Sequence, residues 1–145
     1  MIARVVCVAL AVALASSAVV AQSSAIAERK QIMKGVGAAA KNGAALVKGT
    51  EPYDNEKAIA VFTTYANAAA KMPSLFPEDS KTGGDTTASP KIWSDMDGFK
   101  AAFAKMEADA KAAQGSVKDL DSFKTAFSAM GRNCGACHET YRISK

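Results

Sequence analysis

The sequence is poor in the residues that most often carry enzyme chemistry. Its 145 residues include one histidine, one tryptophan, three cysteines and four prolines. A single histidine leaves no second imidazole to act as a general base, and the chain has neither a G-x-S-x-G motif nor a glycine-rich phosphate loop. We therefore expect a protein that is not an enzyme.

Long apolar runs are absent except at the N-terminus. With 49% hydrophobic and 22% charged residues, the composition is that of a globular domain, which excludes a disordered tail, a collagen-like fibre and a multi-pass membrane protein. Met1–Arg4 is basic, Val5–Ala15 is apolar, and small residues follow up to Ala21, as in a secretory signal peptide. Since a membrane-spanning helix needs about 20 apolar residues, we expect no stable membrane insertion. We predict a signal peptide over 1–21, a domain over 22–145 and export to the periplasm.

Clustered positive charge is also lacking. Removing residues 1–21, which contain Arg4 and no acidic residue, leaves 17 of the 18 basic residues against 14 acidic ones. The lysines are spread along the chain instead of forming a block. This mild excess predicts no nucleic-acid binding.

Apolar residues recur at helical spacing, and no segment alternates with period two over the length of a strand. We predict an all-α protein with helices over residues 24–48, 55–72, 90–115 and 116–143. Asp54 is a suitable N-cap for the second helix, and Gly115 is expected to close the third. The first helix is expected to bury one stripe of residues: Ile26, Met33, Gly37, Ala40, Ala44 and Val47. Residues 73–90, with three prolines and Gly83-Gly84, form a long loop.

Four helices with two short connections and one long loop predict an antiparallel up-down-up-down bundle. In this topology the start of the first helix and the end of the last lie at the same end of the molecule. Met33 and His138 are therefore expected at one end, together with Trp93 and the long loop. One pocket at that end can collect these residues.

Outside the predicted signal peptide, the chain has two cysteines and one histidine, and all three lie in Cys134-Gly135-Ala136-Cys137-His138. A C-x-x-C-H pentad is the attachment signal for c-type haem, in which the two thiols form thioethers and the imidazole binds iron. Residues three apart share one helix face, so Cys134 and Cys137 can reach two neighbouring vinyl groups. Three alternatives fit the sequence less well. A thioredoxin-type redox pair lacks a strand–helix context, a zinc site lacks further ligands, and a structural disulfide leaves His138 unexplained.

Further motifs resemble those of the class II c-type cytochromes, a family of four-helix bundles with covalent haem near the C-terminus. The similarity covers nearly the whole chain after the predicted signal peptide. The matching segments are Arg29-x-x-x-Met33, Lys48-Gly49, Pro52-Tyr53-Asp54, Pro90-Lys91-Ile92-Trp93, Phe99, and Cys134-x-x-Cys137-His138 with Tyr141-Arg142. The resemblance implies one haem c, held by two thioethers.

Two kinds of chemistry occur in this family. Cytochromes c-prime leave the sixth iron position open and bind NO or CO, whereas the cytochrome c-556 group supplies a methionine to iron and carries electrons. The Leu75-Phe76-Pro77 segment and the surroundings of the pentad are more similar to the second group, in which Met33 matches the axial ligand. On this resemblance we expect a one-electron carrier with His138 and Met33 as iron ligands. The alternatives are a gas-binding protein with Met33 as core packing, or ligation by Met72 or Met96.

The resemblance also implies roles for residues around the haem. Trp93 is expected to pack around the macrocycle, and Arg29 and Arg142 either pair with the haem propionates or lie on solvated surface. The expected partners are redox proteins. A homodimer through the first two helices is a further expectation, with close approach at the small residues Gly35, Ala39, Asn42 and Gly43.

The first prediction concerns covalent attachment. Intact-mass measurement of the exported protein should show a chain starting near Gln22 with an increment of roughly 600 Da for one covalent haem. Replacing Cys134 and Cys137 together by alanine should abolish the increment. A wild-type chain without added mass would refute the assignment.

Overall fold

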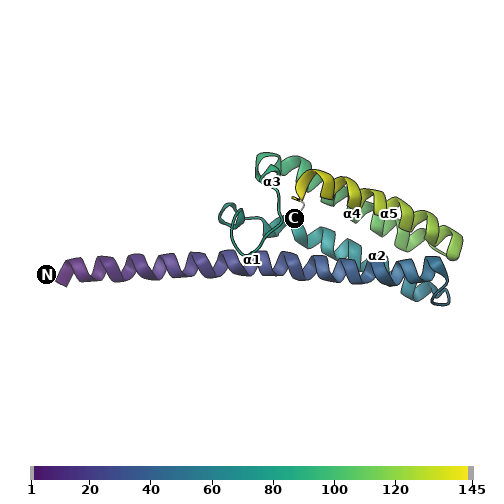
Figure 1. Ribbon diagram of the computed structural model, residues 1–145, viewed down its shortest axis with the longest axis horizontal. Coiled ribbons are helices and arrows are strands. Elements are labelled where there is room, and N and C mark those ends of the chain that lie inside the picture. Colours follow the sequence, from purple (N-terminus) through teal and green to yellow (C-terminus); the bar gives the residue numbers. More distant parts are fainter. Residues whose placement is uncertain (1, 144–145) are drawn as a thin grey trace.

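A computed structural model of the protein describes residues 2–143 and the side chains of residues 24–143. The elements are α1 (Ile2–Lys48), α2 (Asn55–Lys71), the 3-10 turns η1 (Met72–Leu75) and η2 (Glu78–Ser80), α3 (Lys91–Ser94), α4 (Met96–Ser116) and α5 (Leu120–Tyr141). The four long helices pack as the predicted antiparallel bundle, with α2 beside the second half of α1 and the α4–α5 pair lying over them (Figure 1). The predicted signal peptide over 1–21 lies outside the side chains that the structure describes and stays a prediction.

The buried face of α1 is offset from the predicted stripe. Ile26, Ala39 and Leu46 are buried, and Met33 is half-buried against the core. Gly37 was wrongly placed on the buried stripe: it is exposed, with no atom within 4 Å of where its Cβ would be. The face turned inward therefore combines small and large residues along the described length of α1.

The turn into α2 follows the predicted pattern. Gly49 has φ +70°, a left-handed conformation that glycine adopts without strain and that often ends a helix. The Asp54 side chain caps α2 by accepting a hydrogen bond of 2.8 Å from the backbone N–H of Lys57. α2 contributes much of the core through Ala58, Val61, Phe62, Tyr65, Ala66, Ala68 and Ala69.

The second half of the bundle differs from the predicted helices at two points. The predicted helix over 90–115 is divided at Asp95, whose φ of −142° and ψ of 52° end α3 and precede α4. Gly115 lies inside α4 instead of ending it. The last helix begins at Leu120, because Asp119 forms a capping box with Ser122.

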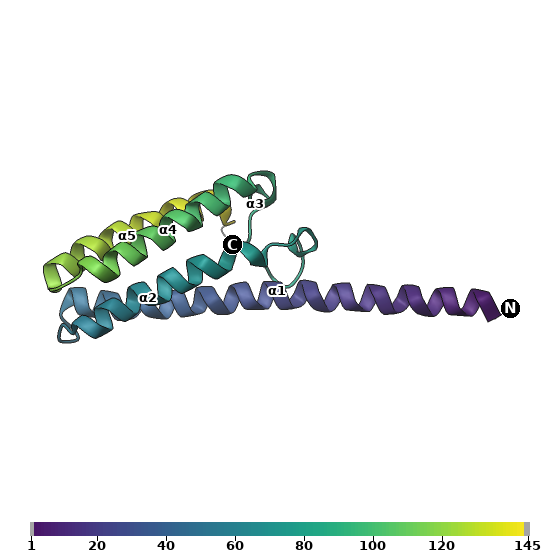
Figure 2. The ribbon, with the colours of Figure 1, turned by 180° about the vertical axis from the view of Figure 1, so that it is seen from behind.

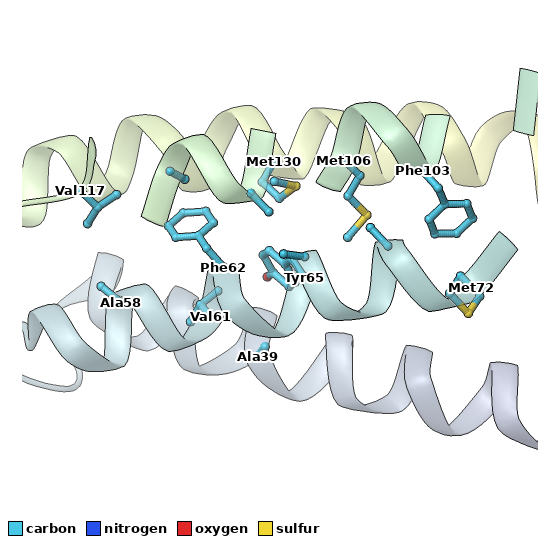
Figure 3. Packing of buried hydrophobic residues seen from close by; sticks show 14 of the residues in the cluster. Ala39, Ala58, Val61, Phe62, Tyr65, Met72, Phe103, Met106, Val117 and Met130 are labelled. Atoms are coloured by element: carbon cyan, nitrogen blue, oxygen red, sulfur yellow. The ribbon is translucent and has the colours of Figure 1, made fainter. Parts of the chain in front are cut away.

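The end of the bundle opposite the long loop is tightly packed around aromatic rings. Phe123 contacts Phe62 with ring centroids 5.7 Å apart and stacks on Phe127 at 5.4 Å. A Cβ atom on Gly43 would lie 2.4 Å from Cε2 of Phe127, so α1 and α5 approach closely here because Gly43 has no side chain. Figure 3 shows the packed layer between the helix pairs, with Phe62 and Met130 on facing sides.

This packing corrects the expectation about small residues on α1. Ala39 and Gly43 are buried inside the subunit, and Figure 3 shows Ala39 directed from α1 toward α2. Gly35 and Asn42 are exposed. Of the four small residues named for a dimer contact, only these two lie on the surface.

Within the described residues, no helix has both the length and the hydrophobicity needed to cross a membrane.

The contact of Gly43 with Phe127 leads to a prediction about stability. Gly43→Ala should destabilise the protein by about 1–3 kcal/mol, because the ring is held by Phe123 and the added methyl group overpacks the α1–α5 contact. Gly35→Ala, with nothing near its Cβ position, should instead stabilise the helix by about 0.5–1 kcal/mol. Urea unfolding of the haem-bearing protein, followed by circular dichroism, measures both. Equal stability of the two variants would contradict the contact.

Candidate haem site

The pentad lies in the last two turns of α5. Cys134 and Cys137 are half-buried against the core, their thiols are free, and His138 is exposed one residue further on. The free thiols give no support to the structural-disulfide alternative. Among the described residues, no group of three or more His, Cys, Asp or Glu side chains could hold a metal ion by itself, so the zinc alternative has no support either.

The surroundings keep the donor groups of the pentad neutral. Burial raises the pKa of Cys134, and burial together with the neighbouring Cys134 raises the pKa of Cys137. Desolvation of the ring and the positive charge of Arg142 lower the pKa of His138. A lowered pKa keeps more of the imidazole neutral, and the neutral form is the one that can bind a metal.

Met33 lies on α1 at the same height as His138 on α5. The Gly43–Phe127 contact fixes the register of these two antiparallel helices. Ten residues back along α1 from Gly43 is Met33, and eleven residues forward along α5 from Phe127 is His138. At about 1.5 Å per residue, both lie roughly 15–17 Å from that contact toward the loop end. The topology therefore brings the two predicted iron ligands to one level of the bundle.

The two helix pairs diverge toward this level. Figures 1 and 2 show the α4–α5 pair leaning away from α1 as it approaches the end that carries the loop. At this level three apolar side chains of α1 and α5, Met33, Val36 and Cys134, are only half-buried. A flat apolar group fixed to two thiols would cover these surfaces. The residues present thus fit a covalent haem in both donor chemistry and packing.

A cluster of aromatic rings lies beside the end of α5. Phe99 contacts Phe76, Phe103 and Tyr141, with ring centroids 4.7, 5.0 and 5.3 Å apart. Trp93 packs on Phe76 at 5.8 Å, and its indole N–H donates to the carbonyl oxygens of Phe76 and Pro77, each at 3.2 Å. Trp93 therefore packs on the loop and fixes it, whereas its packing around the macrocycle stays a prediction.

The two arginines singled out in the sequence have different surroundings. Arg29 is only 5% exposed, so the solvated-surface alternative was wrong for this residue; its guanidinium donates to acceptors in the 75–86 segment. Arg142 is exposed, and its backbone N–H closes the last turn of α5 by donating to the His138 carbonyl at 3.1 Å. Pairing of either arginine with propionates stays a prediction.

Two features near the pentad escaped the sequence analysis. The Tyr141 hydroxyl donates to Oδ2 of Asp95 at 2.9 Å, and a Cβ atom on Gly98 would lie 2.7 Å from that hydroxyl. No sequence periodicity marks this pair, because Asp95 lies in a helix break. Tyr65 is the second feature: it is buried on α2, and burial raises its pKa well above the usual value. Tyr65 lies three residues after Phe62, so both rings are on one face of the helix, and this spacing could have indicated its burial.

Together, a helical bundle with a C-x-x-C-H motif at the end of its last helix defines a four-helix c-type cytochrome. Comparison with known proteins agrees. A family model described as Cytochrome C' matches residues 24–142. A cytochrome c' of Rhodopseudomonas palustris is 43% identical over 142 residues, covering 98% of this chain and 97% of its relative. A cytochrome c-556 of Agrobacterium tumefaciens is 39% identical over 121 residues, covering 83% and 98%.

The solved structures agree with the sequence comparisons. The structure of the cytochrome c' from Rhodopseudomonas palustris superimposes with a TM-score of 0.81 at 45% identity, covering 83% of this chain and 97% of that one. The chain belongs to the cytochrome c' family of haem proteins, which includes relatives named cytochrome c-556.

The hydrogen bond between Tyr141 and Asp95 predicts a pH-dependent stability. This bond, more than the charge of Lys91, lowers the pKa of Asp95. A carboxyl group whose pKa is lower in the folded state stabilises the fold above its unfolded pKa of about 3.9 and loses this effect as the pH falls through the folded pKa. Tyr141→Phe should therefore be less stable than wild type at pH 7, and the difference should narrow below about pH 4.

Thermal unfolding between pH 2 and 7 measures this difference. Tyr53→Phe is the matched control, because its hydroxyl donates to the exposed Asn55 side chain instead of a carboxylate. A gap between Tyr141→Phe and wild type that is independent of pH would show that Asp95 is not the partner.

Proposed function

We propose that this protein carries single electrons, using one covalent haem with His138 and Met33 as axial ligands. The observation that carries the proposal is the register of α1 on α5, which brings Met33 to the level of His138. When bound, the haem supplies reversible one-electron chemistry at its iron. Cys134 and Cys137 hold it through thioethers, and both are half-buried at the inner face of α5.

The proposed ligand pair suits electron transfer more than catalysis. A thioether is a soft, neutral ligand, so Met33 would stabilise the reduced form and raise the reduction potential. Met33 belongs to a continuous helix packed on the core, which limits the rearrangement between oxidation states. The proposal includes no substrate turnover.

Export and partners are part of the same proposal. The basic start, apolar run and small residues of 1–21 support export to the periplasm, where haem attachment would follow. The partners would be redox proteins that meet the exposed end of α5, where His138, Glu139 and Arg142 are exposed. A homodimer would leave this end accessible if it formed through α1 and α2.

Binding of NO or CO at an open sixth position is the second candidate. It is favoured by the similarity to a cytochrome c', the group that the sequence resemblance associates with an open site. In this case the half-buried Met33 would be a packing residue on the distal side. The two candidates differ in one bond, between the Met33 sulfur and iron.

The prediction that separates them uses substitutions that conserve volume. Met33→Leu should abolish the weak far-red sulfur-to-iron absorption band, convert the ferric haem to a high-spin or water-bound form, and make CO binding at least about tenfold tighter, because no ligand competes for the sixth position. Met72→Leu and Met96→Leu should retain the band, since they remove other sulfurs of the same end of the bundle. Absorption spectra and CO titration of the ferrous protein provide the measurements.

A wild-type protein that lacks the band and takes up CO freely has an open site, and gas binding then becomes the better function.

A further inference from the structure

Arg29 is a buried cation whose partners all lie in one segment of the long loop. Its Nη1 donates to the Leu75 carbonyl at 3.2 Å and to Oγ of Ser80 at 3.0 Å. Its Nη2 donates to the Ser80 carbonyl at 3.2 Å and to Oγ1 of Thr86 at 3.3 Å. Because each terminal nitrogen carries two N–H groups, all four terminal donors are used. None of these acceptors is a carboxylate.

The same guanidinium packs on an aromatic ring of the loop. Its Cζ lies 4.4 Å from the centroid of Phe76, within the range of a cation–π interaction. Phe76 is itself held by Phe99 and Trp93. Ser80, which accepts twice from Arg29, is fully buried although it is polar. The loop is therefore organised around Arg29.

From Thr86 the hydrogen bonds continue to the end of α5. Oγ1 of Thr86 also accepts from the backbone N–H of Ala88 at 3.1 Å. Ala88 pairs with Arg142 in an antiparallel bridge. On either side of this bridge, the Ser89 N–H donates to the Tyr141 carbonyl at 3.0 Å and the Ile143 N–H donates to the Thr87 carbonyl at 2.9 Å. A continuous chain of contacts thus joins α1 to the turn that carries His138.

We propose that Arg29 is a positioning residue that holds α1 and the end of α5 at a fixed separation through the 75–89 segment. Arg29 precedes Met33 by one helical turn, so it acts on the part of α1 that carries the proposed distal ligand. The expected effect on iron ligation by Met33 rests on the proposed function. The contacts from Arg29 through the loop to the end of α5 do not depend on iron ligation. The proposal also assigns the Arg29 guanidinium to the loop. A haem propionate would have to displace loop acceptors that already use all four terminal N–H groups of Arg29.

The test compares Arg29→Gln with Lys30→Gln in the haem-bearing protein. Lys30 is the adjacent residue and carries the same charge, but it is exposed and its ion pair with Asp85 lies in solvent. The first readout is hydrogen exchange at the Ser89 and Ile143 amides, which report the loop–α5 pairing. Arg29→Gln should increase their exchange rates by about tenfold or more, and Lys30→Gln should leave them near wild type.

Two further variants separate positioning from general stability. Thr86→Val retains the side-chain shape and Arg29 but removes the acceptor shared by Arg29 and Ala88, so it should also accelerate exchange at Ile143. It answers the question even if Arg29→Gln does not fold. Gly43→Ala loosens the opposite end of the bundle and should leave both amides protected. Arg29→Lys should give partial rescue, since a lysine has three donors but no planar fork.

The second readout is the absorption spectrum. If Met33 binds iron, Arg29→Gln and Thr86→Val should weaken the far-red band and speed CO binding, whereas Gly43→Ala should not. If wild type already lacks the band, the proposed function fails, and the amide exchange alone decides the link. Unchanged exchange at Ile143 in both Arg29→Gln and Thr86→Val would overturn the proposal, as would equal acceleration in Gly43→Ala.

Discussion

The close approach of α1 and α5 at Gly43 sets the height of every residue that the proposed site uses. Both helices are rigid rods, so one fixed contact between Gly43 and Phe127 determines which residues face each other further along. A larger residue at position 43 would separate the helices at the packed end. From this end the helix pairs diverge toward the loop (Figure 1).

The long loop is an ordered part of the molecule in spite of its composition. Three consecutive residues, Gly83, Gly84 and Asp85, have positive φ values of 86°, 53° and 56°, a combination that needs small or polar side chains. A Cβ atom on Gly84 would lie 3.1 Å from the side chain of Ile26, so the turn packs directly on α1. The two glycines serve close packing here, and the loop forms one wall of the α1 end.

The fold and the pentad could be predicted because they depend on local rules. Helical periodicity located the four long helices, and Asp54 was identified as a cap from its residue type alone. The break at Asp95 could not be found in this way, since it is stabilised by the Tyr141 hydroxyl, 46 residues further along the chain. The burial of Arg29 depends likewise on acceptors in a loop without periodicity. Residues that act through distant partners leave no signal in a single sequence.

The bridge between Ala88 and Arg142 has a consequence for the order of folding. The α1–α2 hairpin is formed by neighbouring segments and can assemble early, because its contacts close short loops. The loop exit at 87–89 pairs with residues 141–143, more than 50 residues further along the chain, so this contact closes a long loop. The wall of the site next to His138 is therefore completed last. Until the 87–89 and 141–143 segments pair, Cys134 and Cys137 would lie on an unfinished surface that is open to a large planar group.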